Sequence, residues 1–317
     1  MSLDLMIKKI IEKQNPTVVG LDPKLEMIPE HIKRKAFTDK GEDFFGAAAA
    51  ILAFNCELID AICDIVPAVK PQAAYYEAYG WQGMKALSET ISYAKQKGLF
   101  VILDGKRNDI GSTMEAYGAA HLGKTVVQGR QLAAFDADAL TVNGYLGTDG
   151  IKPLLDICQA EDKGIFVLVK TSNPSSGELQ DLVLSGGKTV YRTVGHMTEN
   201  WGTAVPGKYG YTGAGAVVGA TYPQQLTELR KELPRTFFLI PGYGAQGGKA
   251  KDLTAAFDQN GLGGIVNSSR AVLGAWQKEG CAPESYAQAA RRETIRMRDE
   301  LMDMIGEIKR PAQAYDH

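Results

Sequence analysis

At residues 99–109 the chain reads LFVILDGKRND, an apolar run that ends in charges of alternating sign. Because side chains alternate faces along a strand, Asp104 and Lys106 are expected to point to the same side. Asp109 follows in a turn, just before an expected helix. Charges gathered where a buried strand reaches the surface are costly unless they are paired, and functional sites most often tolerate that cost. The residues alone leave open a structural ion pair or a reactive site.

Short apolar runs recur along the chain, each followed by a polar or glycine-rich turn and then by helical periodicity. We expect eight strands, at residues 17–21, 68–70, 99–104, 139–142, 165–169, 216–219, 237–240 and 264–267. Near-continuous apolar strands that alternate with helices are typical of a parallel sheet covered by helices. The pattern favours an α/β fold, a (β/α)8 TIM barrel, with an open doubly wound sheet as the alternative.

The segments between these strands have helical periodicity. Helices are expected at residues 47–64, 83–98, 111–129 and 187–201, and an amphipathic C-terminal helix at about 283–308 is expected on the barrel exterior. One barrel domain is expected over residues 1–317, with inserts after strands one and five, at about 24–45 and 173–215. Both inserts fall in strand-to-helix connections, where barrel enzymes build their sites. The second could form a mobile lid or an inert surface excursion.

Composition excludes several classes of function. The chain of 317 residues has a formal net charge of −2, so no overall basic field points to nucleic acid. We find no apolar run near the roughly 20 residues of a membrane span. The N-terminus lacks the charged segment followed by an apolar segment that is typical of a signal peptide. The four cysteines form no Cys-x-x-Cys pair and have no histidine at ligand spacing. This pattern favours reduced thiols in a cytoplasmic protein without a metal site.

Polar side chains follow most of the expected strands, and the carboxyl ends of barrel strands meet at one mouth. The loops after strands seven and eight are glycine-rich, and in barrels such loops often hold a phosphate against a helix N-terminus. Arg270 can bind phosphate oxygens with two parallel hydrogen bonds. A merely flexible loop is the competing interpretation. Residues 242–247 also fit G-x-G-x-x-G, but no acidic residue follows the next strand to hold a ribose.

These motifs together resemble the orotidine 5′-phosphate decarboxylase family, in particular its longer bacterial branch. The family signature Asp-x-Lys-x-x-Asp-Ile-x-x-Thr is matched at Asp104, Lys106, Asp109, Ile110 and Thr113. The likeness covers nearly the whole chain and extends to other strand ends, at Asp22, Lys70, Pro241, Gln246 and Arg270. It implies decarboxylation of orotidine 5′-monophosphate (OMP) to UMP and CO2, in pyrimidine biosynthesis, without a cofactor or a metal.

The resemblance also implies a role for each matched residue. Lys106 would stabilise a carbanion at C6 of the pyrimidine and protonate it, and Asp104 would face the substrate carboxylate. The implied catalytic residues are Lys70, Asp104, Lys106 and Asp109. The implied substrate-binding residues are Asp22, Thr113, Ser172, Pro241, Gln246, Gly247, Ser269 and Arg270. Ser172 would bind the pyrimidine edge, Asp22 and Lys70 would lie near the ribose, and Gln246 and Arg270 would hold the phosphate.

A homodimer is implied as well, with Asp109 and Thr113 reaching the neighbouring site. Other hypotheses stay open. The chain also resembles Mg²⁺-dependent sugar-phosphate decarboxylases such as 3-keto-L-gulonate 6-phosphate decarboxylase, but these place a carboxylate where this chain has Lys70, which opposes cation binding. A dinucleotide-dependent oxidoreductase would rest on residues 242–247. A nucleotide-binding protein without turnover would keep the pocket, although the intact Lys106 argues against it.

Overall fold

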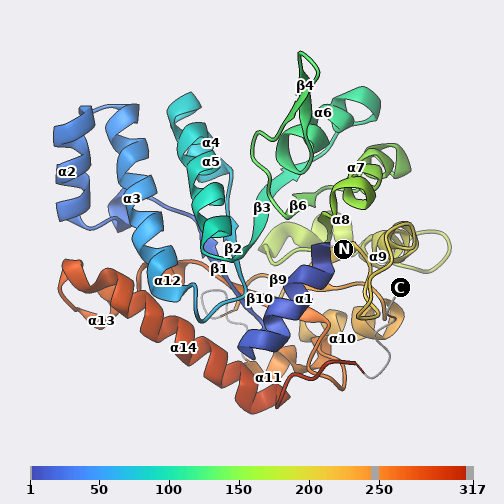
Figure 1. The fold of residues 1–317 in the computed structure, drawn as a ribbon. Helices are drawn as coiled ribbons and strands as arrows, with labels where there is room; N and C mark the ends of the chain where they lie inside the picture. The colour runs from blue at the N-terminus through green and yellow to red at the C-terminus, as the bar shows by residue number, and fades with distance from the viewer. Residues whose placement is uncertain (1, 244–249, 312–317) are drawn as a thin grey trace.

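The computed structural model describes residues 2–243 and 250–311. Eight parallel strands close into a barrel in the order β1-β10-β9-β8-β7-β6-β3-β2, which confirms the expected (β/α)8 fold (Figure 1). The strands are β1 Thr17–Leu21, β2 Ala68–Pro71, β3 Phe100–Arg107, β6 Ala139–Val142, β7 Gly164–Lys170, β8 Ala214–Val218, β9 Phe238–Ile240 and β10 Gly264–Ser268. Each expected strand is found near its predicted bounds, because strands buried on both faces read as apolar runs.

Helices cover the outside of this barrel (Figure 1). The longer ones are α2 Glu30–Lys40, α3 Phe44–Ile62, α5 Gly80–Gln96, α6 Gly111–His121, α7 Thr148–Glu161, α9 Val190–Gly202, α10 Pro223–Glu232 and α14 Tyr286–Ile305. Shorter ones are α4 Ala74–Glu77, α8 Gly177–Gln180, α11 Ala250–Leu253, α12 Arg270–Leu273 and α13 Ala275–Glu279, with 3-10 turns at Leu25–Met27, Pro174–Ser176, Thr254–Ala256 and Pro283–Ser285. The predicted inserts therefore contain α2 after β1, and α8 and α9 after β7.

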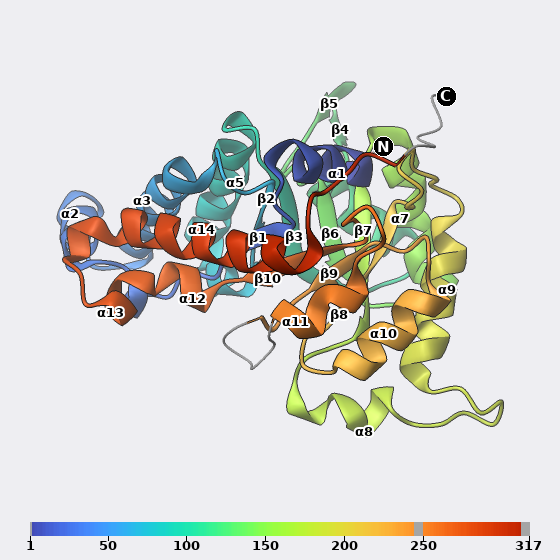
Figure 2. The ribbon, with the colours of Figure 1, turned by 90° about the horizontal axis from the view of Figure 1, so that it is seen from below.

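The N-terminal helix α1, Ser2–Lys13, closes the end of the barrel where the strands begin. Its buried residues Leu3, Met6 and Ile7 pack against Phe100 and Phe166 inside the barrel. Figure 2 shows α1 at one end of the strands and α8 at the other. The open mouth of the barrel is therefore on the side of α8, where the strands end.

The C-terminal helix α14 lies on the exterior and packs against α3 and α12 (Figure 2). The buried stripe of α14 includes Ala290, Met297 and Leu301. Met304, three residues beyond Leu301, has the spacing of this stripe, but its side chain is exposed. The helix ends just after it, at Ile305.

The predicted helix 111–129 is wrong beyond His121. There α6 ends, and an antiparallel hairpin follows, formed by β4 Thr125–Val127 and β5 Arg130–Leu132. Gln128 and Gly129 form its turn with φ angles of 49° and 77°, the conformation that tight hairpins require. The β-branched run 125–127 favours a strand, and a glycine on each side of it disfavours helix. The hairpin projects from the body of the protein (Figure 1).

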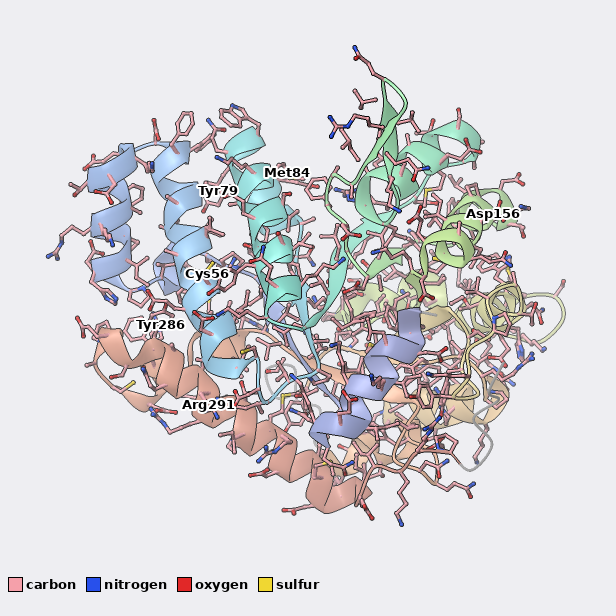
Figure 3. The ribbon with its side chains drawn as sticks, viewed as in Figure 1. Cys56, Tyr79, Met84, Asp156, Tyr286 and Arg291 are labelled. Carbon is pink, nitrogen blue, oxygen red and sulfur yellow. The ribbon has the colours of Figure 1, made fainter. Side chains whose placement is uncertain are left out.

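Within the described residues, α3 is the one helix long and apolar enough to cross a membrane, a run that the sequence interpretation overlooked. However, 56% of its apolar window is buried inside the protein. In Figure 3, Cys56 marks α3, which lies between α5, marked by Met84, and α14, marked by Tyr286 and Arg291. The ring of Tyr286 stacks on Phe54 of α3 at 5.0 Å between centroids. Its apolar character therefore matches that of a core helix.

Candidate active site

The strand β3 is bulged where it reaches the mouth of the barrel. The pairing of β3 with β6 shifts register so that residues 104–106 together lie opposite Thr141 alone. Lys106 adopts a φ of 47°, in the left-handed region that residues other than glycine seldom occupy. Bulges of this kind re-aim side chains, often beside active sites. Asp104 and Lys106 do point to the same side, as predicted, but through this bulge rather than through regular alternation.

Asp104 lies at the centre of a hydrogen-bonded row. Its Oδ2 accepts from Lys70 Nζ at 2.7 Å and from Gln72 Nε2 at 2.9 Å. Its Oδ1 accepts from Lys106 Nζ at 2.6 Å and from Thr141 Oγ1 at 2.8 Å. The side chain of Lys70 is 5% exposed, whereas that of Lys106 is 46% exposed. Lys106 is therefore the more exposed ammonium of this row.

The charges of this row stabilise one another. Burial raises the pKa of Asp104, but the ammonium groups of Lys70 and Lys106 outweigh this effect and hold the pKa well below its ordinary value. Burial lowers the pKa of Lys70, but the carboxylates of Asp104 and Asp22 outweigh it, and the pKa is raised. Asp104 is therefore ionised and Lys70 is charged at neutral pH. A buried ion pair of this kind is costly to assemble and strongly destabilising to break on one side.

Two adjoining cavities open at the mouth and share Lys70, Asp104 and Pro241. The base lobe, as we call the first, has a volume of about 440 Å³ and is also lined by Lys106, Thr141, Leu168, Thr171, Ser172, Asn173, Gln180, Val217 and Leu239. The polar lobe, about 190 Å³, is also lined by Asp22, Gln72, Tyr75, Gly242, Tyr243, Asn267, Ser269 and Arg270. One lobe thus offers an apolar floor with polar edges, and the other offers hydroxyl, amide and guanidinium groups.

These lobes bring together eight of the predicted site residues: Asp22, Lys70, Asp104, Lys106, Ser172, Pro241, Ser269 and Arg270. Asp109 and Thr113 are not among the described residues that line either lobe. Asp109 accepts a hydrogen bond from the backbone of Ile110 at 2.8 Å, and Thr113 is exposed on α6. Gln246 and Gly247 lie outside the described residues.

The predicted site residues do not include Gln72, Thr141 or Gln180, which take part in the site. Gln72 follows Lys70 by two residues, and that spacing at a strand end was the available signal. Gln180, on α8, donates to Thr171 Oγ1 at 2.7 Å and accepts from the Thr171 backbone N–H at 2.9 Å. The segment between Thr171 and Gln180, residues 172–179, has no periodicity that would predict this contact.

Among the described residues, no group of three or more His, Cys, Asp and Glu side chains is placed to hold a metal ion. The ammonium of Lys70 donates to Asp104 Oδ2 at 2.7 Å and also interacts electrostatically with Asp22. The donor set of the described mouth therefore suits an anionic ligand with hydrogen-bonding edges better than a divalent cation.

Comparisons with known proteins identify the family of this chain. The profile of the Orotidine 5′-phosphate decarboxylase / HUMPS family matches residues 18–282. The orotidine 5′-phosphate decarboxylase of Rhodopirellula baltica is 48% identical over 296 residues, covering 92% of this chain and 96% of that protein. The same enzyme of Clostridium perfringens (strain 13) is 41% identical over 305 residues, covering 96% of this chain and 99% of that protein. The solved structure of the Leishmania donovani OMP decarboxylase has a TM-score of 0.70 at 29% identity, covering 94% of this chain and 99% of that chain. This chain therefore belongs to the orotidine 5′-phosphate decarboxylase / HUMPS family.

Proposed function

We propose that this protein decarboxylates OMP to UMP and CO2, with Lys106 as the proton donor and without a metal or organic cofactor. The observation that carries the proposal is the row of Lys70, Asp104 and Lys106 at the junction of the two lobes. Family membership supports the reaction. Relatives named as orotidine 5′-phosphate decarboxylases, which the chain matches over nearly their full length, support it as well.

The chemistry needs a fixed cation beside C6 of the pyrimidine. When the bond between C6 and the carboxylate breaks, its electron pair stays on C6 and CO2 leaves. Preorganised charge stabilises such an anion far better inside a desolvated pocket than in water. The ammonium of Lys106, anchored on Asp104 Oδ1 at 2.6 Å, supplies this charge and then transfers a proton to C6. The product is UMP, and the neutral Lys106 amine regains its proton from solvent.

The polar lobe fits the rest of a nucleotide. Asp22 Oδ1 is buried and has no hydrogen-bond partner among the described residues. A buried acceptor without a donor is costly, and a ribose hydroxyl that donates to the Asp22 carboxylate offsets that cost. Arg270 and Ser269 stand in the same lobe and suit a phosphate. Ser172 in the base lobe suits the polar edge of the pyrimidine.

Product analysis tests the reaction. The purified protein is incubated with OMP, and UMP is measured by chromatography beside released CO2. Equal molar amounts of UMP and CO2 are expected. Turnover of a sugar phosphate that requires Mg²⁺, or oxidation that requires a nicotinamide, would instead support one of the rival enzyme hypotheses. Binding of UMP without any turnover of OMP would support the binding-protein hypothesis.

Replacing Arg270 by alanine is expected to weaken phosphate-bearing ligands selectively. Charge-assisted hydrogen bonds to a phosphate contribute about 1.5–3 kcal/mol, so the Kd of UMP is expected to rise about 10- to 100-fold. Uridine, which lacks the phosphate, is expected to bind the variant and the wild type alike. Calorimetric titration measures both ligands. Equal weakening of UMP and uridine would contradict the assignment of Arg270 to the phosphate.

We also propose a homodimer in which Asp109 and Thr113 complete the neighbouring site. The position of both residues outside the described lobes of their own chain supports this arrangement. Exposed apolar side chains also lie at loops that follow the strands, among them Ile110, Tyr145 and Leu146.

The free thiols of all four cysteines fit a reducing cytoplasm.

Dilution is expected to lower the specific activity, because each site of a dimer that shares residues is incomplete in a monomer. Initial rates per mole of protein are measured over a dilution series, and the mass of the particle is followed by light scattering over the same range. Activity that stays constant while the particle dissociates would contradict the shared site.

A further inference from the structure

We infer that Thr141 is a positioning residue for the proposed decarboxylation, because its hydroxyl fixes the backbone of Lys106 and the carboxylate of Asp104 in one arrangement. The inference rests on the proposed function, since the arrangement matters through the action of Lys106 on a substrate. Thr141 comes from β6, the strand beside β3, and borders the base lobe.

The Thr141 hydroxyl makes two hydrogen bonds of opposite sense. Its oxygen accepts from the backbone N–H of Lys106 at 3.0 Å, and its proton is donated to Asp104 Oδ1 at 2.8 Å. A hydroxyl carries one proton, so donation to Asp104 leaves its lone pairs for the N–H. Thr141 is 1% exposed, and water therefore does not compete for these contacts.

The Thr141 hydroxyl completes a closed set of hydrogen bonds that joins Thr141, Asp104 and Lys106. The ammonium of Lys106 binds Asp104 Oδ1, which is the same oxygen that accepts from Thr141. The backbone of Lys106 binds Thr141 directly. The backbone of Lys106 is therefore tied to the Thr141 hydroxyl directly and its ammonium is tied to it through Asp104 Oδ1. The φ of 47° at Lys106 needs such support from its surroundings. Without the hydroxyl, the bulge of β3 can relax and the ammonium can move away from C6.

Two substitutions at Thr141 separate the hydroxyl from the shape of the side chain. Thr141→Val keeps the branched shape and removes the hydroxyl, and it is expected to lower kcat about 100-fold, the effect of a misplacement near 1 Å. The KM for OMP is expected to change less than about threefold, because the groups assigned to ribose and phosphate are untouched. Thr141→Ser keeps the hydroxyl and is expected to retain most of the wild-type kcat.

Thr294→Val is the matched control. Thr294 is fully buried on α14 and donates to the backbone carbonyl of Ala290 at 2.8 Å, outside the mouth. The control loses a buried hydroxyl as Thr141→Val does, so the two variants are expected to share a fall in thermal stability. A merely structural role for Thr141 predicts that kcat stays at the wild-type value in both.

The pH profile gives a second readout. The hydrogen bond from Thr141 favours the ionised form of Asp104, so its loss raises the pKa of that carboxyl toward the ordinary value. The acid limb of kcat is therefore expected to move to higher pH in Thr141→Val. It is expected to stay at the wild-type position in Thr141→Ser and in Thr294→Val.

An active wild type together with an unchanged kcat in Thr141→Val would overturn the inference. If Thr141→Val does not fold, the pair Thr141→Ser and Thr141→Ala decides in its place. Equal kcat values in that pair would contradict the role of the hydroxyl, whereas an impaired alanine variant beside an active serine variant would support it. A wild-type protein that leaves OMP unchanged overturns the proposed function, and the role of Thr141 falls with it.

Discussion

Replacing Lys106 by alanine is expected to lower kcat for OMP by more than about 10⁴-fold, because the substitution removes both the cation beside C6 and the proton donor. UMP binding is expected to persist, since the groups assigned to the ribose and phosphate lie in the polar lobe. The folded state is expected to survive, because the side chain of Lys106 is 46% exposed. Stopped-flow or steady-state absorbance measures turnover, and calorimetry with UMP measures binding.

Lys8→Ala is the matched control for this substitution. Lys8 lies on α1, at the opposite end of the barrel, and pairs with Glu12 on the surface at 3.5 Å. Loss of that exposed pair is expected to leave kcat unchanged. A Lys106→Ala variant that keeps activity within tenfold of the wild type would contradict the role of Lys106 as proton donor.

Asp104→Asn is expected to lower both activity and stability. The amide carries no charge and accepts through one oxygen, so Lys70 keeps a buried ammonium without its main partner. Removing one member of a buried ion pair costs about 3 kcal/mol of unfolding free energy. The kcat is expected to fall about 10³-fold, because the group that anchors Lys106 loses its negative charge. Urea unfolding and steady-state kinetics measure the two effects.

The stability loss is expected to depend on pH in a defined direction. Lys70 and Lys106 hold the pKa of Asp104 below its ordinary value, against the opposing effect of burial. The carboxylate therefore contributes stability that is fully present above the unfolded-state pKa of about 3.9 and is lost as pH falls toward the folded-state pKa. The difference in unfolding free energy between wild type and Asp104→Asn should shrink below about pH 4.

Asp156→Asn is the matched control on α7, where Asp156 is exposed (Figure 3) and pairs with Lys152 at 2.6 Å. That surface pair is expected to contribute under about 1 kcal/mol, and its loss is expected to leave kcat unchanged. An Asp104→Asn variant as stable and active as Asp156→Asn would show that the row does not depend on the carboxylate. Tighter binding of OMP by Asp104→Asn would indicate that Asp104 repels the substrate carboxylate.

The barrel was predictable because its strands are apolar on both faces and each is followed by a turn. The hairpin at β4 and β5 was not, since the helical interpretation of residues 111–129 gave no weight to the β-branched run 125–127. The packing of α1 over the end of the barrel was also not predicted, because the amphipathic pattern of a helix does not indicate which surface the helix covers.

At the site, the sequence predicted that Asp104 and Lys106 meet but not how they meet. Asp104 and Lys106 were expected to converge by strand alternation, whereas a bulge and a left-handed Lys106 bring them together. The spacing of residues in the sequence could not predict the contact of Gln180 with Thr171, since this contact depends on how the segment after β7 folds back. Such contacts arise from tertiary packing and have no local pattern.

The most direct test of the account is the absorbance of OMP in the presence of the purified protein after treatment with EDTA. Loss of the substrate's ultraviolet absorbance at full rate, without added metal or nicotinamide and with UMP as product, is the predicted result. An assembled dimer that leaves OMP unchanged until Mg²⁺ is restored, or that leaves it unchanged throughout, would contradict cofactor-free decarboxylation by the row of Lys70, Asp104 and Lys106.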